Sequence, residues 1–351
     1  MTATPLVDAA RTRRRAPFAL LLLCALAVAV AVALAGCGEK RDKLGPGATR
    51  ELELMLDYFP NADHAGIYAA QAGGEFRRAG LDVQIRQPPS PAAPINQVAA
   101  GRVDLAISYE PEVLRARDKG LNVVAVAAIV RRPLTSIISL PKAGIRSPKD
   151  LEGKTVGTAG IDYQTSYLRT ILEEADVDPA SVKQRDVGFS LVPALLSRRV
   201  DAVLGGFWNY EGTELAQKRR DPRIIRVDDA GVPRYDELVL VANEDALERD
   251  DSELRAFIGA LARGTRALEK DPDEAIKGLL EANRDLDPKL QRAVVKKTLP
   301  LFLPVDGRPF GYLDGAAWHR FAAWMRDHRL VSEIPDASGA FTNRLLPGES
   351  L

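Results

Sequence analysis

Acidic and aromatic side chains recur where the sequence pattern predicts that strands end and helices begin. The stretch LDYFPNADHAGIYAAQ places Asp57, Tyr58 and Phe59 directly after an apolar run, with His64 five residues further along. A tight turn favours small residues over two adjacent rings, so turn chemistry alone does not explain this set. Ligands of open parallel sheets bind beyond the carboxyl ends of the strands. The stretch therefore predicts part of a binding site, although one ring packing into the core, or Asp63 capping the next helix, explains part of it equally well.

Three later junctions repeat this chemistry. Tyr109 and Glu110 precede Pro111, and proline is a favoured first residue of a helix. An alternative role for Glu110 is to interact with the dipole of that helix. The stretch GGFWNYEG and the stretch PRYDE add further rings and acids, and the loop from Gly157 to Gly160 could offer backbone donors, a weak motif. The predicted ligand-binding residues are Asp57, Tyr58, Phe59, His64, Tyr109, Glu110, Gly160, Trp208, Asn209, Tyr210, Glu211 and Asp236.

These junctions carry aromatic faces and carboxylate acceptors but no lysine and no arginine among the predicted site residues. Such a set suits a flat, nitrogen-rich ring with amino donors, whereas an anion would need the reverse. His319 and His328 fall in a late helical segment, and both cysteines, Cys24 and Cys37, lie in the leader. We therefore predict no catalytic residue, no metal site and no cofactor.

The first residues predict export. Four arginines precede an apolar run that ends in LAGC, and small residues before Cys37 suit a lipoprotein signal peptide over residues 1–36. An uncleaved membrane-spanning helix is the alternative. Residues 37–50 are charged and poor in apolar side chains, as in a flexible tether. We predict a protein that is lipid-anchored through Cys37 at the extracytoplasmic face of the plasma membrane.

Charge and length limit the function classes. The chain of 351 residues has 48 basic and 48 acidic residues, and cleavage of the leader would leave an excess of three negative charges. Nothing in this balance indicates a nucleic-acid partner. Strand-like and helical patterns alternate in two series, which predicts α/β lobes with mainly parallel sheets. Two extended stretches suggest interlobe crossings that separate lobe 1 (51–140 plus 237–345) from lobe 2 (141–236); two independent domains are the alternative.

The chain resembles the THI5-like, or NMT1-like, family in four motifs: LDYFPNADHAGIYAAQ, VAAGRVDLAISYEPEVL, ALLSRRVDAVLGGFWNYEG and GVPRYDELVLVAN. The resemblance covers residues 51–330. It implies a type II periplasmic-binding-protein fold and a receptor that holds a thiamin pyrimidine precursor in the interlobe cleft and delivers it to an ABC permease. We expect a monomer. Related members take riboflavin, and a fungal member is a pyrimidine synthase that consumes a histidine, which His64 resembles. The cysteine motif of that synthase is missing here, which disfavours the enzyme; a purely structural envelope lipoprotein is a third alternative.

Overall fold

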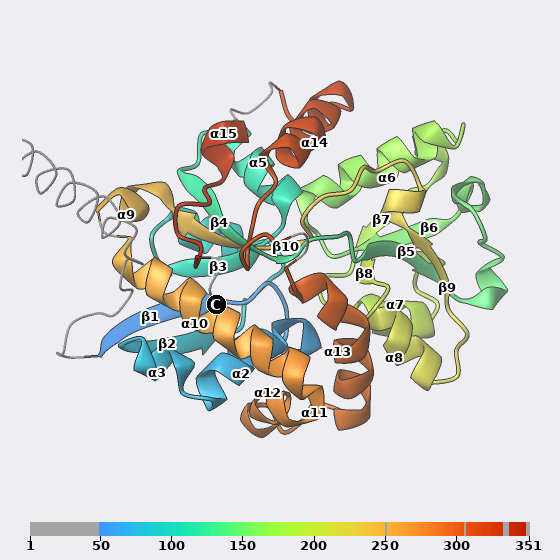
Figure 1. Cartoon of the computed structure of the whole chain (residues 1–351). Coiled ribbons are helices and arrows are strands. Elements are labelled where there is room, and N and C mark those ends of the chain that lie inside the picture. The colour runs from blue at the N-terminus through green and yellow to red at the C-terminus, as the bar shows by residue number, and fades with distance from the viewer. Residues whose placement is uncertain (1–48, 250, 305–306, 333–336, 349–351) are drawn as a thin grey trace, which may run out of the picture. The chain divides into compact units, whose positions relative to one another are not determined.

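Two five-stranded β-sheets organise the part of the chain that the structure describes (Figure 1). The structure is a computed structural model, and it describes residues 49–249, 251–304, 307–332 and 337–348. The predicted signal peptide, Cys37 and nearly all of the tether lie outside the described residues. None of the described helices is both long and apolar enough to cross a membrane.

The first sheet has the strand order β2-β1-β3-β10-β4. Its strands are β1 (Arg50–Met55), β2 (Leu81–Arg86), β3 (Leu105–Ser108), β4 (Val123–Val130) and β10 (Leu238–Asn243). Strand β1 pairs parallel with β2 and β3, while β10 runs antiparallel between β3 and β4. We call this sheet and the helices packed on it the first lobe.

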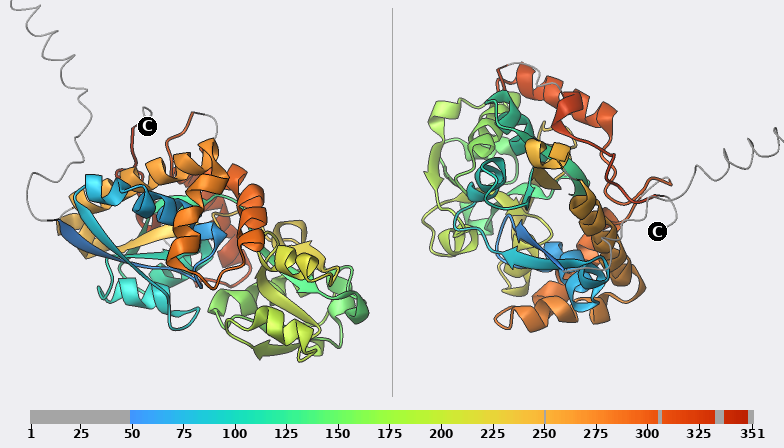
Figure 2. Two further views of the ribbon diagram at one scale, coloured as in Figure 1. Left: turned by 90° about the horizontal axis from the view of Figure 1, so that it is seen from below. Right: turned by 90° about the vertical axis from the view of Figure 1, so that its left-hand side faces the viewer.

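The second sheet repeats this arrangement in the order β7-β6-β8-β5-β9. Its strands are β5 (Thr135–Ser139), β6 (Thr155–Thr158), β7 (Lys183–Asp186), β8 (Ala202–Phe207) and β9 (Arg223–Arg226). Strand β6 pairs parallel with β7 and β8, and β5 is antiparallel to both of its neighbours. In the left view of Figure 2 the green and yellow elements of this second lobe form a group of their own. Two mixed sheets with flanking helices confirm the predicted α/β, two-lobed fold class.

The antiparallel strand of each sheet is the one that enters it from the other lobe. Strand β5 follows the first crossing, and β10 follows the second. The predicted boundary at residue 140 assigns Thr135–Ser139 to lobe 1, but β5 pairs with β8 and β9 of the second sheet. The first crossing therefore lies before Thr135. The pattern could not show this, because an apolar extended run fits either sheet equally well.

A buried carboxylate ties the two crossings together. Glu237 accepts hydrogen bonds from the backbone N–H groups of Leu134 and Thr135, at 2.6 and 2.8 Å, and from the Thr135 hydroxyl at 2.9 Å. The Tyr235 hydroxyl donates a fourth at 3.1 Å. Burial raises the pKa of Glu237 to about 7, while these hydrogen bonds oppose the shift. The two segments that join the lobes are thus held to each other at one point.

Helices pack against both sheets. The described α-helices are α2 (Ala65–Ala72), α3 (Glu75–Arg78), α4 (Ala93–Ala99), α5 (Glu110–Asp118), α6 (Asp162–Glu174), α7 (Leu191–Leu196), α8 (Glu211–Gln217), α9 (Glu244–Arg249), α10 (Ser252–Lys270), α11 (Pro272–Ala275), α12 (Lys277–Ala282), α13 (Pro288–Phe302), α14 (Gly315–Asp327) and α15 (Ala337–Ala340). Helix α10 crosses α2 so closely that a Cβ atom at Gly264 would lie 2.5 Å from the Ala70 nitrogen. This contact attaches the helical tail to the first lobe.

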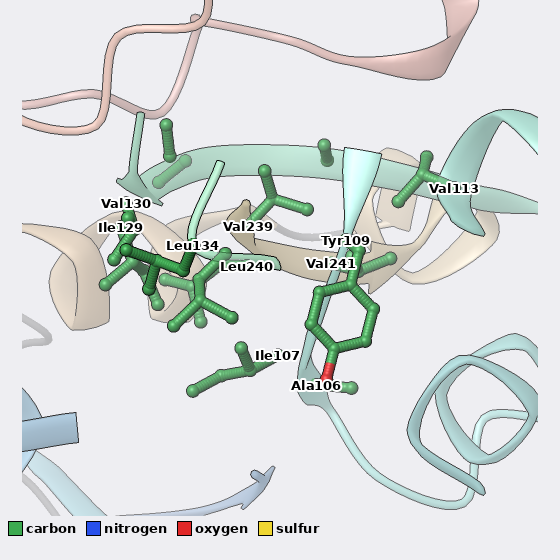
Figure 3. Packing of buried hydrophobic residues seen from close by; sticks show 14 of the residues in the cluster. Ala106, Ile107, Tyr109, Val113, Ile129, Val130, Leu134, Val239, Leu240 and Val241 are labelled. Carbon is green, nitrogen blue, oxygen red and sulfur yellow. The ribbon is translucent and has the colours of Figure 1, made fainter. Parts of the chain in front are cut away.

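The core of the first sheet is built from continuous apolar strands. Every residue of β4, with the sequence VVAVAAIV, is buried, as expected for a strand that is covered on both faces. Figure 3 shows Val239, Leu240 and Val241 of β10 beside the core residues of β3 and β4. Burying such side chains contributes roughly 1.5–3 kcal/mol each. The rigid sheet that results fixes the strand ends from which the site residues project.

Candidate ligand-binding site

A small cavity lies where the two lobes meet. Its lining residues come from both lobes: Asp57, Tyr58, Asn61, Asp63, Pro91 and Tyr109 from the first, and Ala159, Ile161, Tyr163, Gln164, Leu191, Gly205, Phe207, Tyr210 and Glu211 from the second. We call it the interlobe cavity. It leaves about 30 Å³ for the centres of water-sized molecules, and one buried water needs roughly 10–15 Å³ on this measure. The lobes or the lining side chains must therefore move before a ring-sized molecule can enter.

Asp57, at the carboxyl end of β1, is held by two neighbours. Its Oδ2 accepts a hydrogen bond from the Tyr109 hydroxyl at 2.9 Å, and its Oδ1 lies 2.8 Å from Nε2 of His64. Nδ1 of His64 accepts the backbone N–H of Asn61 at 3.2 Å, so the ring proton is assigned to Nε2, which donates to Asp57. Burial and the charge of Asp57 hold the pKa of Tyr109 well above its ordinary value. His64 thus orients the Asp57 carboxylate through this hydrogen bond, although His64 itself does not line the cavity.

Asp63 receives hydrogen bonds from both lobes. Asn209 follows β8 in the second lobe, and its Nδ2 donates to Oδ1 of Asp63 at 2.7 Å; the Thr298 hydroxyl of α13 donates to the same oxygen at 3.0 Å. Oδ2 of Asp63 and Oδ1 of Asn209 are buried with no hydrogen-bond partner among the described residues. Burial raises the pKa of Asp63 to about 6, partly opposed by the neighbouring His64. The Asp63 carboxylate is therefore a lobe-bridging group with one acceptor atom still unused.

Glu211 supplies a third carboxyl group, at the start of α8. Its Oε2 accepts the backbone N–H of Phe207 at 2.7 Å, and the residue is 5% exposed. Burial raises the pKa of Glu211 to about 8, with smaller contributions from the charges of Glu214 and Asp63. Near neutral pH this group is therefore largely protonated, so it can donate an O–H as well as accept an N–H.

Aromatic rings enclose the cavity on two sides. Tyr58 packs edge-on against Phe59 and Phe189, with ring centroids 5.1 and 5.0 Å apart, and its hydroxyl donates to the Phe189 carbonyl at 3.1 Å. Phe59 is 41% exposed and is not a lining residue, so it covers the outside of this cluster. Tyr163 of α6 faces Tyr109 with ring centroids 5.8 Å apart. The rings thus provide contacts between the lobes as well as apolar walls.

Two glycines of the second lobe, Gly160 and Gly205, shape the backbone beside the cavity. Gly205 has a φ of +105°, and a Cβ there would lie 2.4 Å from Nε2 of Gln164. The other end of that amide, Oε1, accepts the backbone N–H of Ala159 at 2.8 Å. Gly160 has a φ of +78° and faces the Asp186 carboxylate, where a Cβ would lie 2.6 Å from Oδ2. Gly160 therefore shapes the loop, while its neighbours Ala159 and Ile161 reach the cavity.

The structure brings five of the twelve predicted residues to the interlobe cavity: Asp57, Tyr58, Tyr109, Tyr210 and Glu211. Phe59, His64, Gly160 and Asn209 lie next to lining residues, as described above. Trp208 instead lies at the first crossing, where its Nε1 donates to the Pro133 carbonyl at 3.1 Å. These outcomes leave the predicted list as a hypothesis about contacts with a ligand.

Glu110 and Asp236 face a different part of the surface. Both line a separate, open hollow beside the second crossing, where Oε2 of Glu110 accepts the Asp236 backbone N–H at 2.7 Å. Oδ2 of Asp236 accepts Nε1 of Trp318 at 2.8 Å. Their junctions match the pattern of Asp57, but hydrogen bonds to the crossing and to α14 turn the side chains away from the interlobe cavity. Their predicted role in ligand binding does not agree with this placement.

The sequence prediction missed several lining residues. Asp63 entered it as a possible helix cap, yet the capping side chain is that of Asn61, which accepts the Asp63 backbone N–H at 2.7 Å. Tyr163 and Gln164 follow β6 at the kind of strand-to-helix junction that the same rule covers, so that rule could have found them. Phe189 follows β7 at a junction of the same kind, and it packs against Tyr58 without lining the cavity. Among the described residues, no cluster of His, Cys, Asp and Glu has the arrangement of a metal site.

At neutral pH the buried carboxyl groups are expected to destabilise the fold. The pKa values of Asp63 and Asp236 are raised to about 6, those of Glu112 and Glu237 to about 7 and that of Glu211 to about 8. At a pH between the unfolded and the folded pKa of such a group, the folded protein binds more protons than the unfolded chain. The contribution of these groups to the free energy of unfolding is therefore fully present below about pH 4 to 5 and is lost as the pH rises through 6 to 8. Calorimetry should show a melting temperature several degrees lower at pH 8.5 than at pH 5.5. The Glu211→Gln variant should show a smaller fall, and a melting temperature that rises over this range would contradict the assignment.

Two mixed sheets with flanking helices and a cavity between the two lobes are the fold of periplasmic solute-binding proteins. The alkanesulfonate-binding protein SsuA from Xanthomonas axonopodis pv. citri, solved with bound MOPS, has this fold: it aligns with a TM-score of 0.67 and 17% identity over 85% of this chain and 99% of its own. The model of the NMT1/THI5 like family matches residues 61–275, and the chain belongs to that family. The predicted resemblance and fold are confirmed.

Curated relatives in the family include binding proteins and enzymes. The formylaminopyrimidine-binding protein of Halalkalibacterium halodurans is 38% identical over 299 residues, which cover 84% of this chain and 91% of that protein. The 4-amino-5-hydroxymethyl-2-methylpyrimidine phosphate synthase of Legionella pneumophila is 26% identical over 84% of this chain and 92% of its own. The more similar of these two relatives is thus a binding protein.

Proposed function

We propose that this chain is the solute-binding receptor of an ABC importer and that it captures an unphosphorylated aminopyrimidine precursor of thiamin in the interlobe cavity. One observation carries the proposal: Asp57, Asp63 and Glu211 converge on a cavity walled by rings, and none of its described lining residues is Lys, Arg or His. An aminopyrimidine offers a flat face for the rings and N–H donors for the carboxyl groups. The 38% identity to a formylaminopyrimidine-binding protein supports this choice of cargo.

Binding requires the lobes to open and close. Tyr58 and Asp63 of the first lobe bond to Phe189 and Asn209 of the second, and the cavity between them has room for one or two waters. A ligand therefore enters when these contacts are broken and is enclosed when they re-form. A cargo that prefers the closed state shifts the equilibrium toward it. The closed arrangement of the two lobes would be the surface that the permease partner recognises.

The synthase reaction of other family members is not expected here. Both ring nitrogens of His64 are engaged, one by Asp57 and one by the Asn61 backbone, and the residue is 1% exposed. The chain also has no cysteine beyond Cys37. Incubation of pure protein with iron and pyridoxal phosphate should therefore yield no pyrimidine product. Riboflavin is the second cargo to test, because the resemblance to the THI5-like family includes members that take riboflavin.

Native mass spectrometry and calorimetry test the proposed cargo. Protein purified without denaturation should carry a small molecule of pyrimidine mass, and protein stripped of it should bind 4-amino-5-hydroxymethyl-2-methylpyrimidine or a formylaminopyrimidine with saturable heat. Saturable binding of riboflavin with no binding of either pyrimidine would replace the proposed cargo. No binding of any of these compounds, with no rise in melting temperature, would contradict a receptor function for pyrimidines and flavins.

We also propose a lipid anchor at Cys37, which lies outside the described residues, and a monomer at the extracytoplasmic face of the plasma membrane. The arginines and apolar run before LAGC carry this part of the proposal. The Cys37→Ser variant should move from the membrane fraction to the soluble fraction, because it cannot be lipidated. A Cys24→Ser variant is the matched control and should stay with the membrane. Retention of Cys37→Ser in the membrane would favour an uncleaved helix instead.

A further inference from the structure

An unused acceptor atom marks Asp63 as more than a structural residue. Oδ2 of Asp63 is buried and has no hydrogen-bond partner among the described residues, although the same carboxylate receives two hydrogen bonds on Oδ1. Buried acceptors without a donor are rare in folded proteins and call for an explanation. Asp63 lines the interlobe cavity, so a molecule in that cavity can supply the missing donor.

The backbone of Asp63 is fixed from several directions. Its N–H donates to the Asn61 side chain at 2.7 Å, and the preceding N–H of Ala62 donates to Oε1 of Gln291 at 2.8 Å. The residue is 3% exposed. The Asp63 carboxylate cannot turn to satisfy Oδ2 without losing its contacts to Asn209 and Thr298. The unused oxygen is therefore held in place before any ligand arrives, which reduces the entropy lost on binding.

The hydrogen-bond donors of Asn209 are already used by Asp63 and its neighbour. Its Nδ2 donates to Oδ1 of Asp63 and to the Thr298 hydroxyl, both at 2.7 Å, so both of its N–H protons are engaged. The Thr298 hydroxyl also lies 3.0 Å from the Val294 carbonyl. None of these groups can donate to Oδ2 as well. The donor that satisfies Oδ2 must come from outside this cluster.

We propose that Asp63 is a ligand-recognition residue that accepts an N–H of the cargo through Oδ2 while its Oδ1 holds the two lobes together through Asn209. This inference rests on the proposed function for the identity of the cargo, but not for the role of Asp63. The cargo class that fits is a neutral or cationic heterocycle with at least one amino donor. Ligand recognition and closure of the lobes then share one carboxylate, because Asn209 reaches Asp63 from the second lobe.

The test combines affinity with the stability of the ligand-free protein. Asp63→Asn keeps the shape of the side chain but replaces one acceptor with a donor, and it should weaken 4-amino-5-hydroxymethyl-2-methylpyrimidine at least 30-fold in calorimetry. The ligand-free variant should melt at the same temperature as the wild type or higher at pH 8, because a buried charge with an unused oxygen is removed. Glu112→Gln is the matched control, since Glu112 is also a buried carboxyl group but does not line the cavity. It should bind the pyrimidine as the wild type does.

The affinity and the melting temperature together distinguish a ligand-recognition role of Asp63 from a structural one. A purely structural Asp63 would show the opposite pattern: the ligand-free variant would melt several degrees lower, and the affinity of the folded protein would stay within about twofold. Either of these observations would overturn the role proposed for Asp63. If the wild type binds no pyrimidine, the proposed cargo is wrong. The melting temperature of ligand-free Asp63→Asn then still shows whether the Asp63 side chain stabilises or destabilises the folded protein.

Discussion

The protein is expected to bind 4-amino-5-hydroxymethyl-2-methylpyrimidine about 1000-fold more tightly than its phosphate ester at pH 7.5. The reason is the acidic character of the cavity lining: three carboxyl groups line the cavity, and its described lining residues include no cationic side chain. At this pH Asp63, whose pKa is raised to about 6, is ionised. Two like charges roughly 6 Å apart repel by about 3 kcal/mol at an effective dielectric constant of about 20, and a phosphate brings up to two charges.

Competition calorimetry measures this discrimination. The unphosphorylated pyrimidine is bound first, and the ester is then titrated against it at constant ionic strength. A sulfate titration serves as the control for nonspecific anion binding and should give no saturable heat. Equal affinities for the alcohol and its ester would mean that the phosphate stays outside the cavity or meets a cation there. That result would contradict the cargo class that the three carboxyl groups define.

The Glu211→Gln variant is expected to bind the same aminopyrimidine 30- to 100-fold more weakly than the wild type. Oε2 of Glu211 is fixed by the Phe207 N–H, so the carboxyl group is presented to the cavity in one orientation. A glutamine of the same shape can no longer both donate an O–H and accept an N–H on its free side. Leaving a buried donor or acceptor of the ligand without its partner costs about 1–3 kcal/mol, a range that includes the expected change in affinity.

Glu214→Gln is the matched control for this variant. Glu214 lies on the same helix, pairs with Lys218 and does not line the cavity. Its replacement should change the dissociation constant by less than twofold. Both variants should show wild-type circular dichroism, so that a weaker affinity reports on binding rather than folding. An unchanged dissociation constant for Glu211→Gln would remove Glu211 from the site.

The sequence located the strand ends well but predicted the directions of side chains poorly. Asp57 and Glu110 illustrate the difference, because each is an acid next to a tyrosine at a strand-to-helix junction. Asp57 is kept at the interlobe cavity by Tyr109 and His64. Glu110 is engaged by the backbone N–H of Asp236, which lies 126 residues further along the chain. A local pattern gives the end of the strand, whereas the hydrogen-bond partner decides which way the acid points.

The alternation of strands and helices, the fold class and the acidic and aromatic character of the junctions can be read from the sequence, because hydrophobic period and residue type are local properties. The pairing of β5 in the second sheet, and the hydrogen bond between Asp63 and Asn209, 146 residues apart, become visible only in the folded chain. The hydrogen bond between Asp63 and Asn209 depends on how the two lobes meet. Burial in the folded protein also raises the pKa values of Asp63 and Glu211, since desolvation acts on a carboxyl group only where the folded chain surrounds it.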